Sequence, residues 1–373
     1  MLTVRMVREG RCVKMSNSGV LDFSIASKCC GVSITVCVPV YNVERYLREC
    51  LDSIFAQDYP DFDVVMVDDG STDGSGAICN EYVEKHPQRA FVVHKDNEGL
   101  LLARREGFAR AAGQYVMCVD SDDMLAPGAI SAIAAAISST GADVVRYLPT
   151  RELDDVASLT GKVPYRYFSL DEKPVMLQAL CCSTSGSENP MWFKAIRREC
   201  VGTDVEYSDF KGLTFAEDFL QTLTVYDRAE TFCFLDATLY YYRPGSGITH
   251  AYSPHFYRDV CRCLDVAEGF ARRWEHDYSC GGLKAGLAAC RLDSASQYAE
   301  WMAAQGDKTG LDRLRRSDSF ERCATVKGVS AFLRFDRKIV IAALKLRIYF
   351  PISVVVKAKA IKAGLLGFIG RGA

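Results

Sequence analysis

Three carboxylates stand within four residues, directly after a short apolar run. The run covers residues 115–119, and Asp120, Asp122 and Asp123 follow it. A short apolar segment that ends in turn chemistry is typical of a strand buried on both faces of a parallel sheet. Clustered like charges are costly unless a cation or hydrogen-bond donors compensate them, and closely spaced oxygen ligands suit Mg²⁺ or Mn²⁺. These acids are therefore candidate metal ligands, the alternative being a solvated turn before a helix that starts near Pro127.

Acidic residues recur at the ends of other predicted elements. Asp69 follows the apolar run 62–67, and Glu217 and Asp218 lie in the first turn of a helix predicted over residues 213–223. Acids in a first turn often only favour the helix dipole, an effect of about 1 kcal/mol or less. Ligands of an open parallel sheet bind outside the carboxyl ends of its strands, so Asp69 is expected on the same edge as the first cluster.

The elements that must position these acids alternate between strand and helix. Strands are predicted at 32–38, 62–67, 90–94, 115–119 and 143–148, and helices from about 43, over 74–86, after 99 and over 127–138. This alternation predicts an α/β fold with a parallel sheet and right-handed crossovers. Neither GxGxxG nor GxxxxGK[ST] follows any of the strands. A metal held by carboxylates is then the natural way to neutralise a diphosphate.

The second half of the chain is less regular. The pattern predicts a polar loop over 151–167, a short strand at 191–196, a pair of strands at 231–235 and 238–242, a glycine-containing loop at 243–250, and helices from about 254 onward. Three regions follow from this order: an N-terminal extension, expected to be flexible, at 1–31, an α/β domain at 32–250 and a helical region at 251–373.

Composition excludes several classes of protein. The chain has 373 residues, of which 49% are hydrophobic and 25% charged, and its net charge is −2, so no global field favours nucleic acid. Its 16 cysteines are scattered without a zinc-type spacing. They are interpreted as small buried hydrophobic residues in a reducing cytosol.

The C-terminal tail is basic and amphipathic. After Asp336 it contains eight Lys and Arg residues and no acid, interleaved with apolar residues. Two interpretations stay open. The tail contacts an anionic membrane surface, or it forms a helix that packs on the body and turns a basic face to water.

The motifs together resemble glycosyltransferase family 2. The matching segments are 38–42 (VPVYN), 67–74 (VDDGSTDG), 97–99 (NEG) with Ala103, Arg104 and Gly107, 119–123 (VDSDD) and 217–218 (ED). The resemblance implies the GT-A (Rossmann-like) fold, with a central mostly parallel sheet flanked by helices and a helical C-terminal extension. It also implies an inverting hexosyltransferase that uses a nucleotide sugar, usually a UDP-sugar.

The resemblance implies a set of donor-binding residues: Pro39, Tyr41, Asp69, Asn97, Arg104, Asp120, Asp122, Arg243, Ser246 and His250. Pro39 and Tyr41 would line the nucleobase pocket, and Asp69 would accept a hydrogen bond from the base. Asp120 and Asp122 would contact the ribose and the metal on the diphosphate.

The resemblance also implies the reacting groups. Mg²⁺ or Mn²⁺ would be held by Asp122 and Asp120, with Asp123 as a substitute ligand, and Asp218, or else Glu217, would be the general base. The acceptor would be a hydroxyl of a glycan or a polyprenyl-linked saccharide in cell-surface polysaccharide synthesis. This places the protein in the cytoplasm or at the inner face of the plasma membrane.

Two other functions use similar chemistry. A sugar-phosphate nucleotidyltransferase also has a nucleotide-binding α/β sheet with acidic metal ligands, but its glycine-rich, basic triphosphate loop is not found near the first strand. A non-catalytic nucleotide-sugar-binding protein would not need intact acids at every motif.

Overall fold

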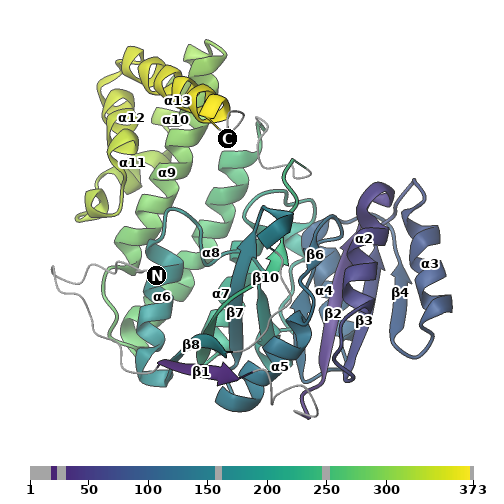
Figure 1. Ribbon diagram of the computed structural model, residues 1–373. Coiled ribbons are helices and arrows are strands. Elements are labelled where there is room, and N and C mark those ends of the chain that lie inside the picture. Colours follow the sequence, from purple (N-terminus) through teal and green to yellow (C-terminus); the bar gives the residue numbers. More distant parts are fainter. Residues whose placement is uncertain (1–17, 23–30, 156–161, 246–252, 370–373) are drawn as a thin grey trace. The chain divides into compact units, whose positions relative to one another are not determined.

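The computed structural model describes residues 18–22, 31–155, 162–245 and 253–369 (Figure 1). It divides into two compact units, one made of residues 1–176 and 189–250 and the other of residues 177–188 and 251–373. The short segment 177–188 groups with the helical unit instead of the sheet.

The first unit is built on a ten-stranded sheet. Its strands are β1 (Ser18–Asp22), β2 (Ile34–Val40), β3 (Phe62–Asp68), β4 (Ala90–His94), β5 (Tyr115–Cys118), β6 (Met124–Leu125), β7 (Val144–Thr150), β8 (Lys162–Phe168), β9 (Lys194–Arg197) and β10 (Phe232–Tyr241). Its helices are α2 (Glu44–Phe55), α3 (Ser75–Lys85), α4 (Leu100–Arg110), α5 (Ala129–Thr140) and α7 (Glu217–Arg228), and α6 (Lys173–Cys182) crosses into the second unit. The short 3₁₀ helices are η1 (Leu153–Asp155), η2 (Leu170–Glu172), η3 (Arg198–Val201) and η4 (Ser208–Phe210).

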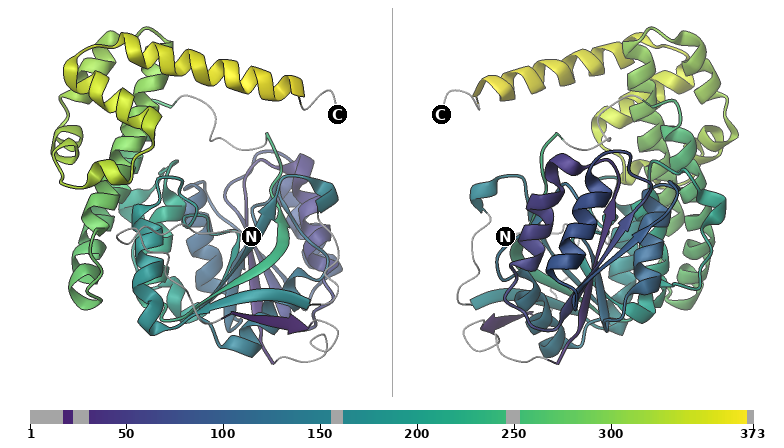
Figure 2. Two further views of the ribbon diagram at one scale, coloured as in Figure 1. Left: turned by 60° about the vertical axis from the view of Figure 1, so that its left-hand side comes forward. Right: turned by 90° about the vertical axis from the view of Figure 1, so that its right-hand side faces the viewer.

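The strand order is β1-β8-β10-β7-β9-β5-β2-β3-β4, with β6 paired to β10. Strands β2 to β5 are parallel, and β7, β10 and β1 run in the same direction, whereas β6, β8 and β9 run the opposite way. The prediction of a mostly parallel α/β sheet flanked by helices is therefore confirmed. Figure 2 shows the helices on both faces of the sheet.

Alternate residues of the central strands face two different layers of helices. Val36 and Val38 belong to the main core, to which α2, α3 and α5 contribute. On the other face, Val65 and Val67 pack with Ala103 of α4. Both faces are covered, which explains why β2 reads as a continuous apolar run. The described cysteines are unbridged and most are buried, as predicted for small hydrophobic residues.

Three segments differ from the prediction. Residues 162–168 form β8 instead of a polar loop, and residues 18–22 of the supposed extension pair with it as β1. In β8, Val163, Tyr165 and Tyr167 alternate with polar residues or proline, a two-residue period hidden by the polar stretch before it. The predicted pair of strands at 231–242 is one strand, β10, with register shifts after Phe234 and Thr238.

The second unit is helical, as predicted. Its helices are α8 (Phe256–Asp277), α9 (Leu283–Ala304), α10 (Lys308–Arg315), α11 (Asp318–Ala324), α12 (Phe335–Leu346) and α13 (Phe350–Ile369), with the 3₁₀ helix η6 (Val329–Ala331). Helix α9 supplies much of the core of this unit, including Leu292, Ala295 and Ala299. Within the described part of the chain, no helix has the length and apolar character needed to cross a membrane.

Candidate active site

The carboxyl ends of the central strands bring the predicted acids to one edge of the sheet. Strand β2 pairs in parallel with both β3 and β5, so the residues that follow these strands emerge at the same edge. Asp69 follows β3, and Asp120 stands two residues after β5. The backbone N–H of Asp69 donates to the Val40 carbonyl at 2.9 Å, which extends the ladder past the end of the strand and fixes the direction of the following turn.

Arg104 of α4 joins this edge to the start of α7. Only 1% of its side chain is exposed. Its Nη2 donates to Asp120 Oδ1 at 2.8 Å, and its Nη1 donates to Asp218 Oδ1 at 2.5 Å. Burial alone would lower the pKa of Arg104, but Asp120 and Asp218 raise it well above its ordinary value. The guanidinium therefore stays charged and holds the two carboxylates at a fixed separation.

Glu217 and Asp218 begin α7 after a constrained turn. Ala216 has a φ of 65°, a left-handed conformation that costs a residue with a Cβ roughly 1 kcal/mol or more. Burial and the neighbouring Asp218 raise the pKa of Glu217 to about 8. Burial also raises the pKa of Asp218, although Arg104 opposes the shift. A raised pKa makes a carboxylate a stronger base, and the general-base role of this pair stays a prediction.

Asp123 faces the protein interior. It is 1% exposed, and it accepts hydrogen bonds from the Tyr240 hydroxyl and the Arg243 backbone N–H, both at 2.8 Å. The same Tyr240 hydroxyl accepts from the Asp120 backbone N–H at 3.1 Å. Burial and the nearby Asp120 raise the pKa of Asp123 to about 8. Asp123 thus ties the acidic turn to the end of β10.

Asp120 and Asp122 are the more accessible acids of this turn. The Asp120 side chain is 21% exposed, and Asp122 is partly exposed. In the described part of the chain, no three His, Cys, Asp or Glu side chains gather as a metal-binding group. The oxygens nevertheless fit Mg²⁺ or Mn²⁺, because such ions are commonly held by one or two carboxylates together with phosphate oxygens of the substrate.

Asp69 shapes the loop after β4. Its carboxylate is 3% exposed and accepts hydrogen bonds from the backbone N–H groups of Glu98 at 3.0 Å and Gly99 at 2.8 Å. Lys95 Nζ lies 2.9 Å from the same carboxylate. Gly70, at φ +76°, lets the loop after β3 approach the loop after β4, since a Cβ at this position would lie 2.8 Å from the backbone nitrogen of Asn97. A contact of Asp69 with a nucleobase stays a prediction.

Replacing Asp69 by asparagine should destabilise this loop. One carboxylate oxygen becomes an amide donor that faces other donors, which leaves buried groups unpaired and costs about 1 to 3 kcal/mol. Thermal unfolding would measure the loss, and nucleotide-sugar affinity should fall with it. Asp96→Asn, at an exposed neighbour, is the matched control. Equal stability of the two variants would contradict a structural role for Asp69.

The remaining predicted donor residues fall into three groups. Pro39 lies in buried β2, whereas Tyr41 is 51% exposed just beyond it and Asn97 is also exposed. Arg243 lies against the acidic turn, where its Nε donates to the Asp122 carbonyl at 2.8 Å and its Nη2 to Glu49 at 2.6 Å. The other two, Ser246 and His250, lie outside the described residues.

The sequence interpretation missed two residues of this site. The hydroxyl of Tyr240 forms hydrogen bonds with both Asp120 and Asp123. In the sequence, Tyr240 is one of three consecutive tyrosines, a pattern that predicts only a strand. Lys194 is fully buried, and its charge, like that of Arg104, opposes the rise that burial causes in the pKa of Asp218. A lysine within the apolar run 191–196 was a usable signal, because lysine is almost never fully buried unless it is paired.

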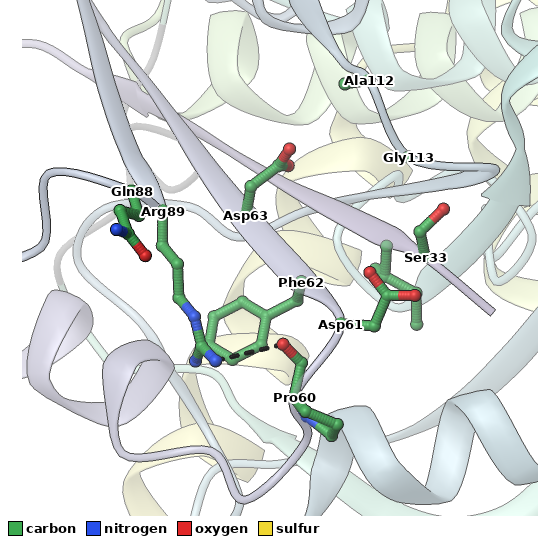
Figure 3. A pocket seen from close by; sticks show the side chains of 10 residues that line it. Ser33, Pro60, Asp61, Phe62, Asp63, Gln88, Arg89, Ala112 and Gly113 are labelled. Carbon is green, nitrogen blue, oxygen red and sulfur yellow. Dashed lines mark hydrogen bonds between the residues drawn. The ribbon is translucent and has the colours of Figure 1, made fainter. Parts of the chain in front are cut away.

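A pocket of about 380 Å³ lies elsewhere on the first unit. Figure 3 shows its lining side chains, including Asp61, Asp63 and Arg89, with Arg89 donating to the Pro60 carbonyl at 3.1 Å. It also includes Ile34 and Phe62, the first residues of β2 and β3. The pocket is therefore at the amino ends of the strands, opposite the acidic edge.

Known proteins resemble this chain in sequence and in fold. Residues 35–187 match the family described as "Glycosyl transferase family 2". The chain is 46% identical over 111 residues to "Glycosyltransferase GlyA" of Streptococcus pneumoniae, a match that covers 30% of this chain and 16% of GlyA. It is 30% identical over 228 residues to "Uncharacterized glycosyltransferase EpsJ" of Bacillus subtilis, covering 59% of this chain and 64% of EpsJ. The matches thus span less than two thirds of these relatives.

A solved structure gives the fold. The chain resembles the crystal structure of Staphylococcus aureus TarS 1–349 in complex with UDP-GlcNAc, with a TM-score of 0.51 and 19% identity over 88% of this chain and 92% of that chain. This shared fold confirms the predicted fold class, a mostly parallel sheet flanked by helices with a helical C-terminal region.

Proposed function

We propose that the chain, whose residues 35–187 match glycosyltransferase family 2, is an inverting glycosyltransferase that moves a sugar from a nucleotide donor to an acceptor hydroxyl. The observation that carries this proposal is the bridge made by Arg104. One buried guanidinium holds Asp120, on the donor side, and Asp218, a potential base, at hydrogen-bond distance. A donor group and a base held at a fixed separation are what one in-line displacement requires.

The donor is proposed to be a UDP-sugar that lies along the acidic edge. Tyr41 offers an exposed ring for stacking on the base, and Pro39, Asp69 and Asn97 are proposed to complete the base pocket. Asp120 would contact the ribose. Support comes from the shared fold with TarS, whose crystal structure contains UDP-GlcNAc.

The acceptor hydroxyl is proposed to lose its proton to Asp218. The raised pKa of this carboxyl suits a general base, and Arg104 keeps its Oδ1 oriented. Glu217, whose Oε1 lies 4.0 Å from Arg104, is the second candidate. A single displacement by the deprotonated hydroxyl inverts the anomeric carbon.

A divalent cation, Mg²⁺ or Mn²⁺, is proposed to be held by Asp122 and Asp120 with the donor diphosphate. When bound, it would stabilise the leaving diphosphate by neutralising its charge. The hydrogen bonds of Asp123 to Tyr240 and Arg243 support a positioning role for Asp123, and direct ligation remains its alternative.

Metal removal should abolish turnover. A chelator is expected to stop nucleoside diphosphate release, and added Mn²⁺ or Mg²⁺ should restore it. Asp122→Ala should raise the metal concentration for half-maximal activity by at least about ten-fold, whereas Asp154→Ala, at an exposed acid, should leave it unchanged. An unaltered metal requirement in Asp122→Ala would remove the metal assignment.

The acceptor is proposed to be a glycan or a polyprenyl-linked saccharide of the cell surface. Support comes from relatives such as TarS, named a poly(ribitol-phosphate) β-N-acetylglucosaminyltransferase. Such acceptors place the protein in the cytoplasm with a peripheral contact to the inner, anionic face of the plasma membrane.

The test is a panel of nucleotide sugars incubated with the protein and Mn²⁺. Release of the nucleoside diphosphate and thermal stabilisation by one donor are expected. Pyrophosphate release from a nucleoside triphosphate and a sugar phosphate would instead indicate a nucleotidyltransferase. Calorimetric binding of a donor without any turnover, across a panel of saccharide acceptors, would indicate a non-catalytic binding protein.

A further inference from the structure

The last helix of the chain turns apolar side chains outward. On α13, Phe350 is 77% exposed, Val354 48% and Ile361 64%, and Lys357 is exposed between them. Their spacing of four, three and four residues places all four side chains on one face of an α-helix, here called the outer face. A surface helix ordinarily turns its apolar face to the core and its charges to water. Helix α13 buries Ile352 in its unit and also exposes apolar side chains on its outer face.

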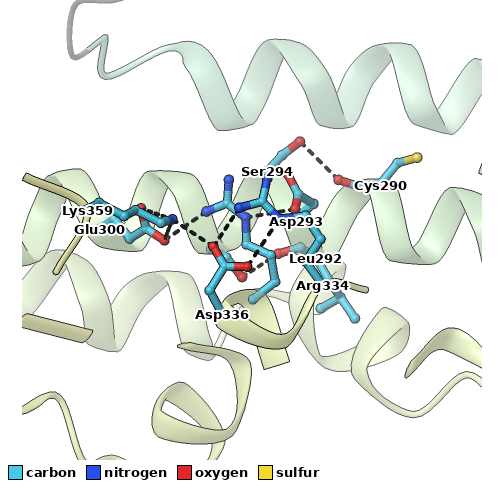
Figure 4. A network of polar contacts seen from close by, with 10 residues as sticks. Cys290, Leu292, Asp293, Ser294, Glu300, Arg334, Asp336 and Lys359 are labelled. Carbon is cyan, nitrogen blue, oxygen red and sulfur yellow. Dashed lines mark hydrogen bonds and ion pairs between the residues drawn. The ribbon is translucent and has the colours of Figure 1, made fainter. Parts of the chain in front are cut away.

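The opposite face of α13 is fixed to its own unit. Ile352 is fully buried. Lys359 Nζ lies 2.7 Å from Glu300 Oε1 of α9 and 3.0 Å from Asp336 Oδ2 of α12, a network drawn in Figure 4. Arg337 of α12 donates to the same Glu300 at 2.8 Å. Rotating the outer face into the core would break these ion pairs, so its exposure is built into the unit.

The residues that lead into α13 have the same character. Leu346 is 68% exposed and Ile348 53%, and Lys345 and Arg347 beside them are also exposed. After Asp336 the sequence contains no acid, and its basic residues are Arg337, Lys338, Lys345, Arg347, Lys357, Lys359, Lys362 and Arg371. Exposed apolar groups therefore occur together with the exposed cations Lys345, Arg347 and Lys357, whereas Arg337 and Lys359 are paired with acids of the unit.

We infer that the outer face of α13, with Leu346 to Ile348, is a docking surface for an anionic lipid bilayer. Apolar side chains gain free energy on entering the boundary between headgroups and acyl chains, and Lys and Arg beside them are attracted to anionic lipids. A second copy of this chain is a poorer occupant, because pairing two such faces would bring like charges together. The inference rests on the membrane contact in the proposed function and assigns residues to it. It does not depend on sugar transfer.

Vesicle flotation of the full chain tests this surface. Vesicles of phosphatidylcholine with phosphatidylglycerol in equal parts should bind the protein, pure phosphatidylcholine should bind it weakly, and high salt should weaken binding. The variant Phe350→Gln/Val354→Gln/Ile361→Gln should lower the partition coefficient by at least about ten-fold. Arg347→Gln/Lys357→Gln should lower it about five-fold for each cation removed.

The matched control removes exposed apolar residues of the first unit. Val20, Phe91 and Leu153 are 58%, 49% and 55% exposed, and replacing all three by glutamine should leave vesicle binding unchanged. Circular dichroism verifies that each variant is folded. The inference is overturned if the wild-type protein does not bind anionic vesicles. It is also overturned if the triple glutamine variant of α13 binds them as strongly as the wild type does. A dimer in light scattering that the α13 variant dissociates, without vesicle binding, would assign the face to a second copy. Sugar transfer assayed separately distinguishes this failure from failure of the proposed function.

Discussion

Replacing Arg104 by methionine is expected to cost about 3 to 5 kcal/mol of folding free energy, the usual cost of removing one member of a buried ion pair. Asp120 and Asp218 would lose their shared cation, and both side chains are only about one-fifth exposed (21% and 19%). Donor turnover should fall with the loss of stability, because both carboxylates lose their fixed positions. Chemical denaturation of the purified variant measures the change in free energy.

The pH dependence of the folding free energy lost in Arg104→Met is the sharper test. Without Arg104, the pKa of Asp218 should rise further, because Arg104 is the group that most opposes the upward shift. A carboxyl whose folded pKa lies above its unfolded value binds more protons when folded, so its contribution to stability falls as pH rises through that interval. The variant should therefore be more strongly destabilised at about pH 8 than at about pH 5.5.

Arg105→Met is the matched control for this experiment. Arg105 is the next residue of α4, and its guanidinium donates hydrogen bonds to the carbonyl oxygens of Val201 and Gly202. Its loss should destabilise the fold by a similar amount at both pH values, since a carbonyl does not titrate. If the Arg104 and Arg105 variants respond to pH alike, the ion-pair account of Arg104 is wrong.

Replacing Asp218 by asparagine should lower kcat by about 10² to 10⁴, the usual contribution of a positioned general base. The amide is isosteric and its oxygen can still accept from Arg104 Nη1, so folding and donor KM should change little. The acidic limb of the pH–rate profile should disappear with the carboxyl. In the wild type that limb should lie above the ordinary value of 3.8 for an aspartate, because burial raises the pKa of Asp218.

Glu217→Gln is the control for Asp218. Glu217 lies next in the chain and its pKa is raised to about 8, but its Oε1 is 4.0 Å from Arg104 and makes no close bridge. The Glu217→Gln variant should retain activity within about ten-fold of the wild type. If instead Glu217→Gln is inactive and Asp218→Asn is active, the roles of the two residues are exchanged.

Much of the acidic edge could be predicted from sequence because it follows from local rules. Strands β2, β3 and β5 are short apolar runs, and parallel pairing brings their carboxyl ends together. The sequence alone therefore predicts Asp69 and Asp120 on one edge. The end of each apolar run marks the end of a strand and the start of a turn. The acids in that turn are therefore predicted to lie at the carboxyl edge of the sheet.

What could not be predicted depends on contacts between distant parts of the chain. The inward direction of Asp123 depends on Tyr240, which is 117 residues away in sequence. The bridge from Arg104 to Asp218 spans 114 residues. Strand β8 exists because β1 and β10 supply its partners, and no local signal reports that pairing. The outward apolar face of α13 likewise depends on the ion pairs of Lys359, whereas the sequence alone left its orientation open.

The central claim is inversion at the anomeric carbon by a base held in this site. Proton NMR during hydrolysis of the donor found in the panel, with Mn²⁺ and a high protein concentration, tests it most directly. From an α-linked nucleotide sugar the wild type should first release the β-anomer, and Asp218→Asn should release none above background. An α-anomer as the first product, or equal release by both proteins, would contradict the account.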